Sequence, residues 1–180
     1  MTRGGRLALL LLALWSFPAG ANDGALPRES PLAPDTATVA IRVYGLGLVP
    51  FDGRFARFHG MLRYDPGDPA RCRVTLQIDA ASLSMTPEAM TATVLGPDFL
   101  DAARYPTLAY MGTCGPAVMA GALTLHGVTR PFGLSLAWRR DAVAATGRIR
   151  RADWGMTALP RLGGRFVRIM VTVALGRQGG

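Results

Sequence analysis

Lysine is absent from this sequence, and all 20 of its basic residues are arginine. Schiff-base chemistry on a lysine and the lysine of a phosphate-binding loop are therefore excluded. The 180 residues also contain only two histidines and two cysteines. These four residues are too far apart in the sequence for a compact zinc-binding pattern, since they lie at His59, Cys72, Cys114 and His126. We therefore expect no metal site.

Residues used in hydrolytic enzymes are scarce as well. Glu29 and Glu88 are the only glutamates. No serine lies in a Gly-x-Ser-x-Gly motif of the kind that carries the nucleophile of α/β-hydrolases. The sequence therefore favours a non-enzymatic protein.

Long apolar segments are limited to the run LALLLLALWSF near the N-terminus, which is shorter than the roughly 20 residues needed to span a membrane. Arg3 and Arg6 precede it, and small residues at 19–21 follow it, which is the pattern of an export signal. We predict that residues 1–21 are a signal peptide cleaved after Ala21. The mature protein is then expected to be periplasmic or secreted.

The net charge of +8 does not indicate a nucleic-acid partner. Nucleic-acid-binding domains concentrate positive charge on one face and interleave it with aromatic residues. These arginines are mostly single, apart from Arg139 with Arg140 and the group Arg148, Arg150 and Arg151. We expect most of them to lie on solvated faces.

The composition, with 49% hydrophobic and 18% charged residues, is that of one globular domain. Residues 22–35 carry three prolines and no hydrophobic period, which predicts a flexible leader. We expect the folded domain to cover residues 36–176.

Alternation of apolar and polar residues dominates this domain and is typical of strands with one buried face. Eight such runs are separated by short turn-forming segments: TVAIRVY, FHGMLRY, RCRVTLQID, TLAYMGTC, GALTLH, FGLSLAW, AVAATGRI and RFVRIMVTVAL. We predict an all-β fold, an eight-stranded antiparallel barrel whose closure removes exposed sheet edges. A sandwich is the alternative.

The alternation of apolar and polar residues is interrupted between the third and fourth runs. Thr86 is a candidate N-cap, Pro87 fits the first helical position and Glu88 the first turn. We therefore expect one or two short helices there.

The interior of an eight-stranded barrel is either filled by side chains or holds one small ligand, and the sequence leaves both open. The inward positions are aliphatic and aromatic, so a cavity would accept an apolar chain. The residues expected to line the interior are Val39, Ile41, Val43, Phe58, Leu62, Tyr64, Val74, Leu76, Ile78, Phe99, Leu108, Tyr110, Leu123, Leu125, Leu134, Leu136 and Trp138.

Four strings resemble motifs of the YceI-like family in order and spacing: GRFARFHG, DFLDAARYP, GALTLHGVTRP and RADWGM. The resemblance covers nearly the whole predicted domain. It implies an exported lipocalin-like barrel that carries or stores an isoprenoid lipid, a quinone or a polyprenyl chain, with no other cofactor. A structural envelope protein with a filled core and a lipid-modifying enzyme are the alternatives. Transient contact with a membrane surface or a membrane electron-transfer protein is left open, as is a homodimer.

Two of these strings contain polar residues that the resemblance places at loops: His126 and Arg130 in HGVTRP, and Arg151 and Asp153 in RADWGM. One interpretation is that an arginine there binds a quinone carbonyl or a diphosphate through charge-assisted hydrogen bonds. The favoured interpretation is that Arg151 and Asp153 fix the loops, by pairing with each other or with turn carbonyls.

The two cysteines occupy matching positions in successive predicted strands. Cys72 opens one strand and Cys114 closes the next, so they would lie opposite each other in an antiparallel pair. An exported protein meets an oxidising compartment in which such a pair forms a bond. We predict a Cys72–Cys114 disulfide, with two buried free thiols as the alternative.

Overall fold

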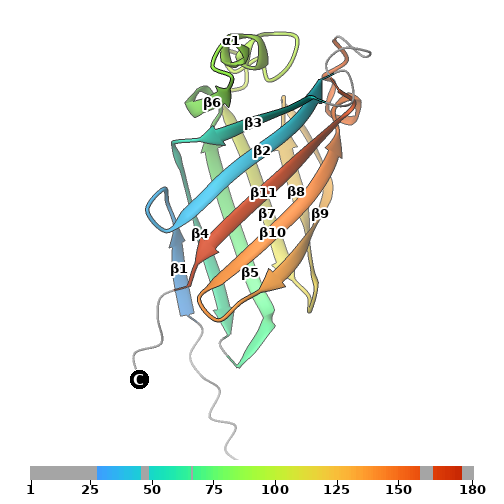
Figure 1. Ribbon diagram of the computed structural model, residues 1–180. Coiled ribbons are helices and arrows are strands. Elements are labelled where there is room, and N and C mark those ends of the chain that lie inside the picture. Colours follow the sequence, from blue (N-terminus) through green and yellow to red (C-terminus); the bar gives the residue numbers. More distant parts are fainter. Residues whose placement is uncertain (1–27, 46–48, 66, 159–163, 176–180) are drawn as a thin grey trace, which may run out of the picture.

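The computed structural model describes residues 28–45, 49–65, 67–158 and 164–175. The strands form one antiparallel sheet in the order β1-β4-β5-β7-β8-β9-β10-β11-β2-β3-β6. Figure 1 shows this sheet curled around a single interior, with α1 and β6 at one end and β1 toward the other. No helix within these ranges is both long and apolar enough to cross a membrane.

Short turns and helices connect the strands of the sheet. The strands are β1 (Arg28–Leu32), β2 (Ala37–Gly45), β3 (Val49–Phe55), β4 (Phe58–Asp65), β5 (Asp68–Asp79), β6 (Leu83–Thr86), β7 (Thr107–Cys114), β8 (Val118–Leu125), β9 (Val128–Trp138), β10 (Ala142–Arg150) and β11 (Phe166–Ala174). The helices are the 3-10 turns η1 (Ala80–Ser82) and η2 (Arg151–Trp154) and the α-helix α1 (Met90–Leu95).

Bends in two long strands explain most of the difference between the eight predicted strands and those observed. β3 continues into β4 across Ala56 and Arg57, and β5 continues into β6 across η1. Hydrogen bonds from Ala56 N to the Ser82 oxygen (3.1 Å) and from Asp79 N to the Arg57 oxygen (3.0 Å) carry the pairing through the bend. Because β3 and β4 form one bent strand, the sheet closes on itself there. The predicted all-β antiparallel fold is confirmed, with a larger number of strands.

The bend is fixed by the side chain of Asp79. Its carboxylate accepts hydrogen bonds from Ala81 N (2.9 Å) and from Arg57 Nε (2.8 Å). The hydrogen bond from the Arg57 guanidinium is the main reason that the pKa of Asp79 lies below its usual value. A capped turn and an exposed ion pair thus hold the corner of the sheet.

The prediction that residues 22–35 form a flexible leader is wrong for residues 28–32. These residues form strand β1 at the edge of the sheet. In its pairing with β4, Leu32 lies opposite Gly60. Ser30 and Leu32 are buried, with 9% and 2% of their surfaces exposed. Pro31 fits because an edge strand tolerates a residue without an N–H donor. Residues 1–27, which include the predicted signal peptide, lie outside the described ranges.

The helical segment predicted between the third and fourth runs contains α1, but its predicted N-cap is wrong. Thr86 ends β6, where it pairs with Asp52, and its peptide bond to Pro87 is cis. Helix α1 begins at Met90 with Ala89 at the N-cap, which makes no side-chain capping bond. Pairing with β3 places Thr86 in the sheet, so it cannot serve the helix.

Strand β5 confirms the alternation predicted for the run RCRVTLQID. Cys72, Val74, Leu76 and Ile78 are buried, and the residues between them are exposed. Because β5 pairs antiparallel with β7, Cys72 faces Cys114, and the two form a disulfide with Cα atoms 4.9 Å apart. The predicted disulfide is present.

Candidate ligand-binding cavity

A cavity of about 150 Å³ lies in the interior of the sheet, at the end covered by α1. It is lined by Val39, Ile41, Val43, Gly45, Phe51, Phe55, Leu76, Ile78, Met85, Met90, Val94, Phe99, Leu100, Leu108, Tyr110, Leu123, Leu125, Phe132, Leu134, Ile149, Arg151, Met156, Val167, Ile169 and Val171. Among the described residues of this lining, Arg151 is the one that carries a charge. A lining so dominated by hydrocarbon suits an apolar ligand.

A smaller cavity of about 40 Å³ lies in the same interior, beside Leu32 and the disulfide. Leu76, Tyr110, Leu134 and Val171 border both cavities. The two spaces therefore meet at these side chains and belong to one apolar interior.

Most residues predicted to line the interior border one of these two cavities. Those at the larger cavity are Val39, Ile41, Val43, Leu76, Ile78, Phe99, Leu108, Tyr110, Leu123, Leu125 and Leu134. Those at the smaller cavity alone are Leu62, Val74, Leu136 and Trp138. Phe58 and Tyr64 are buried but border neither, because they lie near the two ends of β4, beside the bend and beside the turn to β5.

Other lining residues were missed from the sequence. Phe51 and Phe55 come from β3, where Pro50 and Gly53 obscured the strand, although the two phenylalanines are spaced as one face of a strand requires. Met85 and Met90 come from the cover formed by β6 and α1. No local pattern places the cover over the cavity, since this depends on how the chain folds back across the sheet.

Three aromatic rings form part of the cavity wall and its support. The Phe132 ring lies edge-on to Tyr110 and to Trp154, with centroid separations of 6.2 and 6.3 Å. The indole Nε1 of Trp154 donates to the Leu123 oxygen at 3.3 Å. Burial raises the pKa of Tyr110 to about 12.

Arg151 bonds to backbone carbonyls, as the favoured interpretation of the sequence expects, and it also borders the cavity. Only 4% of its surface is exposed. Its Nε donates to the Gly164 oxygen (2.7 Å) and its Nη2 to the Ala158 oxygen (3.1 Å), so it holds the following loop through backbone carbonyls. Its guanidinium lies over the Phe99 ring, 4.6 Å from the centroid, and borders the cavity. Burial lowers the pKa of Arg151 below its usual value.

The remaining polar candidates do not border the cavity. His126 and Gly127 have φ values of 52° and 71° and form the tight turn between β8 and β9, where positive φ at both positions fits a two-residue hairpin. The His126 ring contacts Tyr105, with centroids 4.7 Å apart. Arg130 and Asp153 are exposed. The HGVTRP string is thus a hairpin turn in this structure.

Metal-binding geometry is not found among the residues that the structure describes. No group of three or more His, Cys, Asp or Glu side chains there could hold an ion. Cys72 and Cys114 bond to each other, and His59 is exposed on β4.

The sequence is similar to several curated proteins. It is 28% identical over 169 residues to a UPF0312 protein of Vibrio cholerae serotype O1 (strain M66-2). The aligned region covers 85% of this chain and 88% of that protein. It is 29% identical over 132 residues to a UPF0312 protein of Pseudomonas syringae pv. tomato. That aligned region covers 70% of this chain and 67% of the relative.

The fold is similar to those of solved structures. Burkholderia cenocepacia BcnA aligns with a TM-score of 0.64 and 20% identity over 77% of this chain and 96% of that one. A polyisoprenoid binding domain from Saccharophagus degradans, implicated in plant cell wall breakdown, aligns with a TM-score of 0.55 and 14% identity over 82% of this chain and 98% of that one. At such identities the likeness concerns the fold alone. A sequence model of the YceI-like domain matches residues 31–175, and the chain therefore belongs to the YceI-like family.

Proposed function

We propose that this protein is a non-enzymatic carrier or storage protein that binds the apolar chain of an isoprenoid lipid in its interior. The observation that carries the proposal is the larger cavity, whose lining, within the part of the chain that the structure describes, is apolar apart from Arg151. The similarity to a polyisoprenoid binding domain supports the choice of an isoprenoid chain.

The chain of the lipid would supply most of the binding free energy. Each methylene group moved from water into an apolar site contributes ~0.8 kcal/mol. A cavity of about 150 Å³ is the size that accepts a benzene molecule. A longer chain therefore needs the cavity to widen, and Met85, Met90 and Met156 at its border are flexible side chains suited to this.

Export is part of the same proposal. The predicted signal peptide supports it, and so does the disulfide, since structural disulfides persist mainly in oxidising compartments. Contact with a membrane surface or a membrane electron-transfer protein would then serve to load and release the lipid.

Mass spectrometry of an organic-solvent extract tests the proposal. Protein purified from the exported fraction of its host should release an isoprenoid lipid, and Leu76→Arg should abolish this because Leu76 borders both cavities. Gln77→Arg is the matched control, since Gln77 is exposed on the same strand. If Leu76→Arg does not fold, Val171→Phe fills the interior without adding charge. A wild-type extract free of lipid would favour the structural protein with a filled core.

A further inference from the structure

A second pocket adjoins the apolar cavity and differs from it in having several charged residues in its lining. Its volume is about 200 Å³, and it is lined by Arg150, Arg151, Ala152, Met156, Thr157 and Arg165. Arg151 and Met156 border both this pocket and the apolar cavity. The two spaces therefore adjoin each other at these two side chains, and we call the second one, which three arginines line, the arginine pocket.

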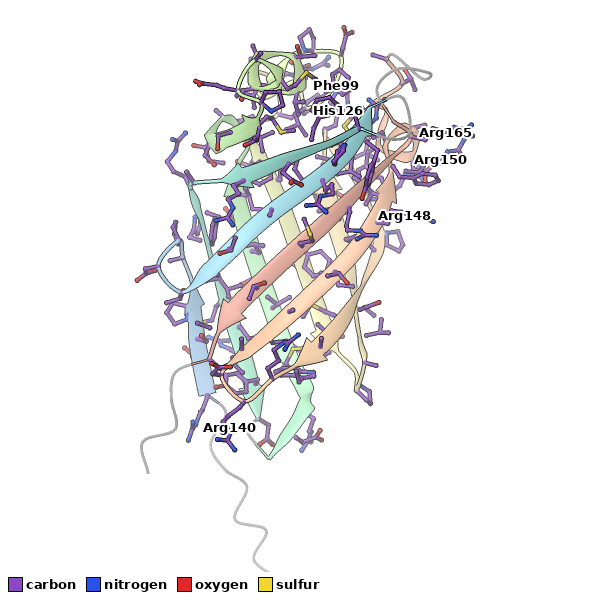
Figure 2. All side chains as sticks on the ribbon, viewed as in Figure 1. Phe99, His126, Arg140, Arg148, Arg150 and Arg165 are labelled. Carbon is purple, nitrogen blue, oxygen red and sulfur yellow. A yellow bond between two sulfur atoms is a disulfide. The ribbon has the colours of Figure 1, made fainter. Side chains whose placement is uncertain are left out.

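Backbone pairing brings the three arginines together. Arg150 ends β10 and Arg151 begins η2. The Arg151 N–H donates to the Arg165 oxygen at 3.0 Å, which places the residue before β11 beside the start of η2. Figure 2 shows Arg150 and Arg165 side by side at the end of the molecule that carries Phe99, with Arg140 at the opposite end.

The charges of the arginine pocket are uncompensated. Within the described residues, none of the three arginines has a carboxylate within ion-pair distance. The Arg151 side chain is buried, and its Nη1 has no hydrogen-bond partner there. A buried cation without a counter-charge is destabilising, and a buried donor without an acceptor adds to this. An anion in the arginine pocket would supply the missing counter-charge.

We propose that the arginine pocket binds the oxyanion headgroup, a phosphate or a carboxylate, of a lipid whose chain lies in the apolar cavity. This proposal rests on the lipid-binding function and adds a preference for acidic lipids over neutral ones such as quinones. Arginine suits the role because its planar group of donors matches oxyanions and forms charge-assisted hydrogen bonds with them. Arg150 and Arg165 contribute from the exposed side of the pocket and Arg151 from the buried side.

Three ligands with one tail test the headgroup assignment: geranylgeranyl phosphate, geranylgeranoic acid and the neutral alcohol geranylgeraniol. We expect wild-type protein to bind the two acids about tenfold or more tightly than the alcohol, because hydrogen bonds to charged groups are roughly twice as strong as those between neutral groups. The preference should weaken as salt is raised, since the pocket is partly open to solvent. Titration calorimetry or displacement of a fluorescent lipid measures these affinities.

The variants that test the headgroup site change the exposed arginines Arg150 and Arg165. These changes leave the hydrogen bonds of Arg151 to backbone carbonyls in place. Arg150→Gln combined with Arg165→Gln should weaken binding of both acids about tenfold and leave geranylgeraniol unchanged. Arg140→Gln is the matched control, because it removes one exposed arginine at the other end of the molecule and should change none of the affinities.

The outcomes separate this proposal from the function on which it rests. Wild-type protein that binds none of the three ligands would overturn the lipid-binding function itself. Equal affinities for acids and alcohol, or acid affinities unchanged in the double variant, would overturn only the headgroup assignment. Inorganic phosphate that binds as tightly as geranylgeranyl phosphate would show a site for free phosphate and would also overturn it.

Discussion

The hydroxyl group of Tyr110 donates a hydrogen bond to the backbone oxygen of Phe132, 3.2 Å away, across the inner face of β8. This contact joins β7 to β9, which are not neighbours in the sheet. Gly121 of β8 makes it possible, because a Cβ atom there would lie 2.6 Å from the Tyr110 hydroxyl oxygen. The wall between the two cavities is thus held by a polar bond within an apolar interior.

Tyr110→Phe should destabilise the protein at neutral pH by about 1 kcal/mol, the usual net contribution of a hydrogen bond. The pKa of Tyr110 is about 12 in the folded state, against 10.0 for an ordinary tyrosine. Between these values the unfolded chain has released the proton and the folded protein has not, so stability falls as pH rises. The advantage of wild type over Tyr110→Phe should therefore shrink above about pH 10. Urea unfolding of both proteins at about pH 8 and about pH 11 measures this, and an equal loss of stability in the two proteins over that range would contradict it.

Gly147→Ala should destabilise the protein by about 1–3 kcal/mol through overpacking. A Cβ atom at Gly147 would lie 2.5 Å from Cζ of Phe132 and 2.8 Å from Cδ2 of Leu134. Phe132→Leu removes the nearer atom, so the double variant should be more stable than the sum of the two single changes predicts. Gly133→Ala is the control, since its Cβ would meet only atoms at 3.7 Å or beyond. Strictly additive changes in the free energy of unfolding would show that Phe132 is not the obstacle.

Local alternation was sufficient to predict the strands with an unbroken period of two, whereas β3, which also has partners on both sides, was missed because Pro50 and Gly53 interrupt its pattern. In β5, Val74 and Leu76 face the core while Thr75 and Gln77 face solvent. The alternation of apolar and polar residues in the sequence has the same period of two. The same regularity predicts that Cys72 and Cys114 lie opposite each other on successive strands, where they form the disulfide. These features depend on residues close together in the chain.

Features that depend on distant parts of the chain could not be predicted in this way. Strand β1 is short and contains Pro31, and only its pairing with β4 shows that it belongs to the sheet. Among the described residues, the Nη1 of Arg151 has no partner because the carbonyls of Ala158 and Gly164 accept from the other two nitrogens, and the sequence does not show where these carbonyls lie. The arginine pocket likewise requires Arg165 to meet Arg150 and Arg151 across paired strands.

Leu32→Ala should destabilise the protein by about 2–5 kcal/mol, the usual range for truncating a buried leucine. Leu32 has 2% of its surface exposed and borders the smaller cavity. Glu29→Ala on the same strand is the control, because its ion pair with Arg63 is exposed and such pairs contribute about 0–1 kcal/mol. Denaturant unfolding compares the two. If Leu32→Ala unfolds like wild type, β1 does not contribute to the core and the flexible-leader prediction regains support.

Replacing both cysteines, Cys72→Ala with Cys114→Ala, should lower the free energy of unfolding by about 4 kcal/mol. The disulfide joins residues 42 positions apart, and in the chain-entropy model a loop of this length restricts the unfolded chain by that amount. Reduced wild-type protein should unfold at the same urea concentration as the double variant, because both lack the cross-link. Thr113→Ala, which changes an exposed neighbour of Cys114, is the control and should unfold close to oxidised wild type. Thiol titration of denatured, unreduced protein checks the bond directly: close to zero free thiols are expected, whereas two per chain would show that the bond does not form in solution.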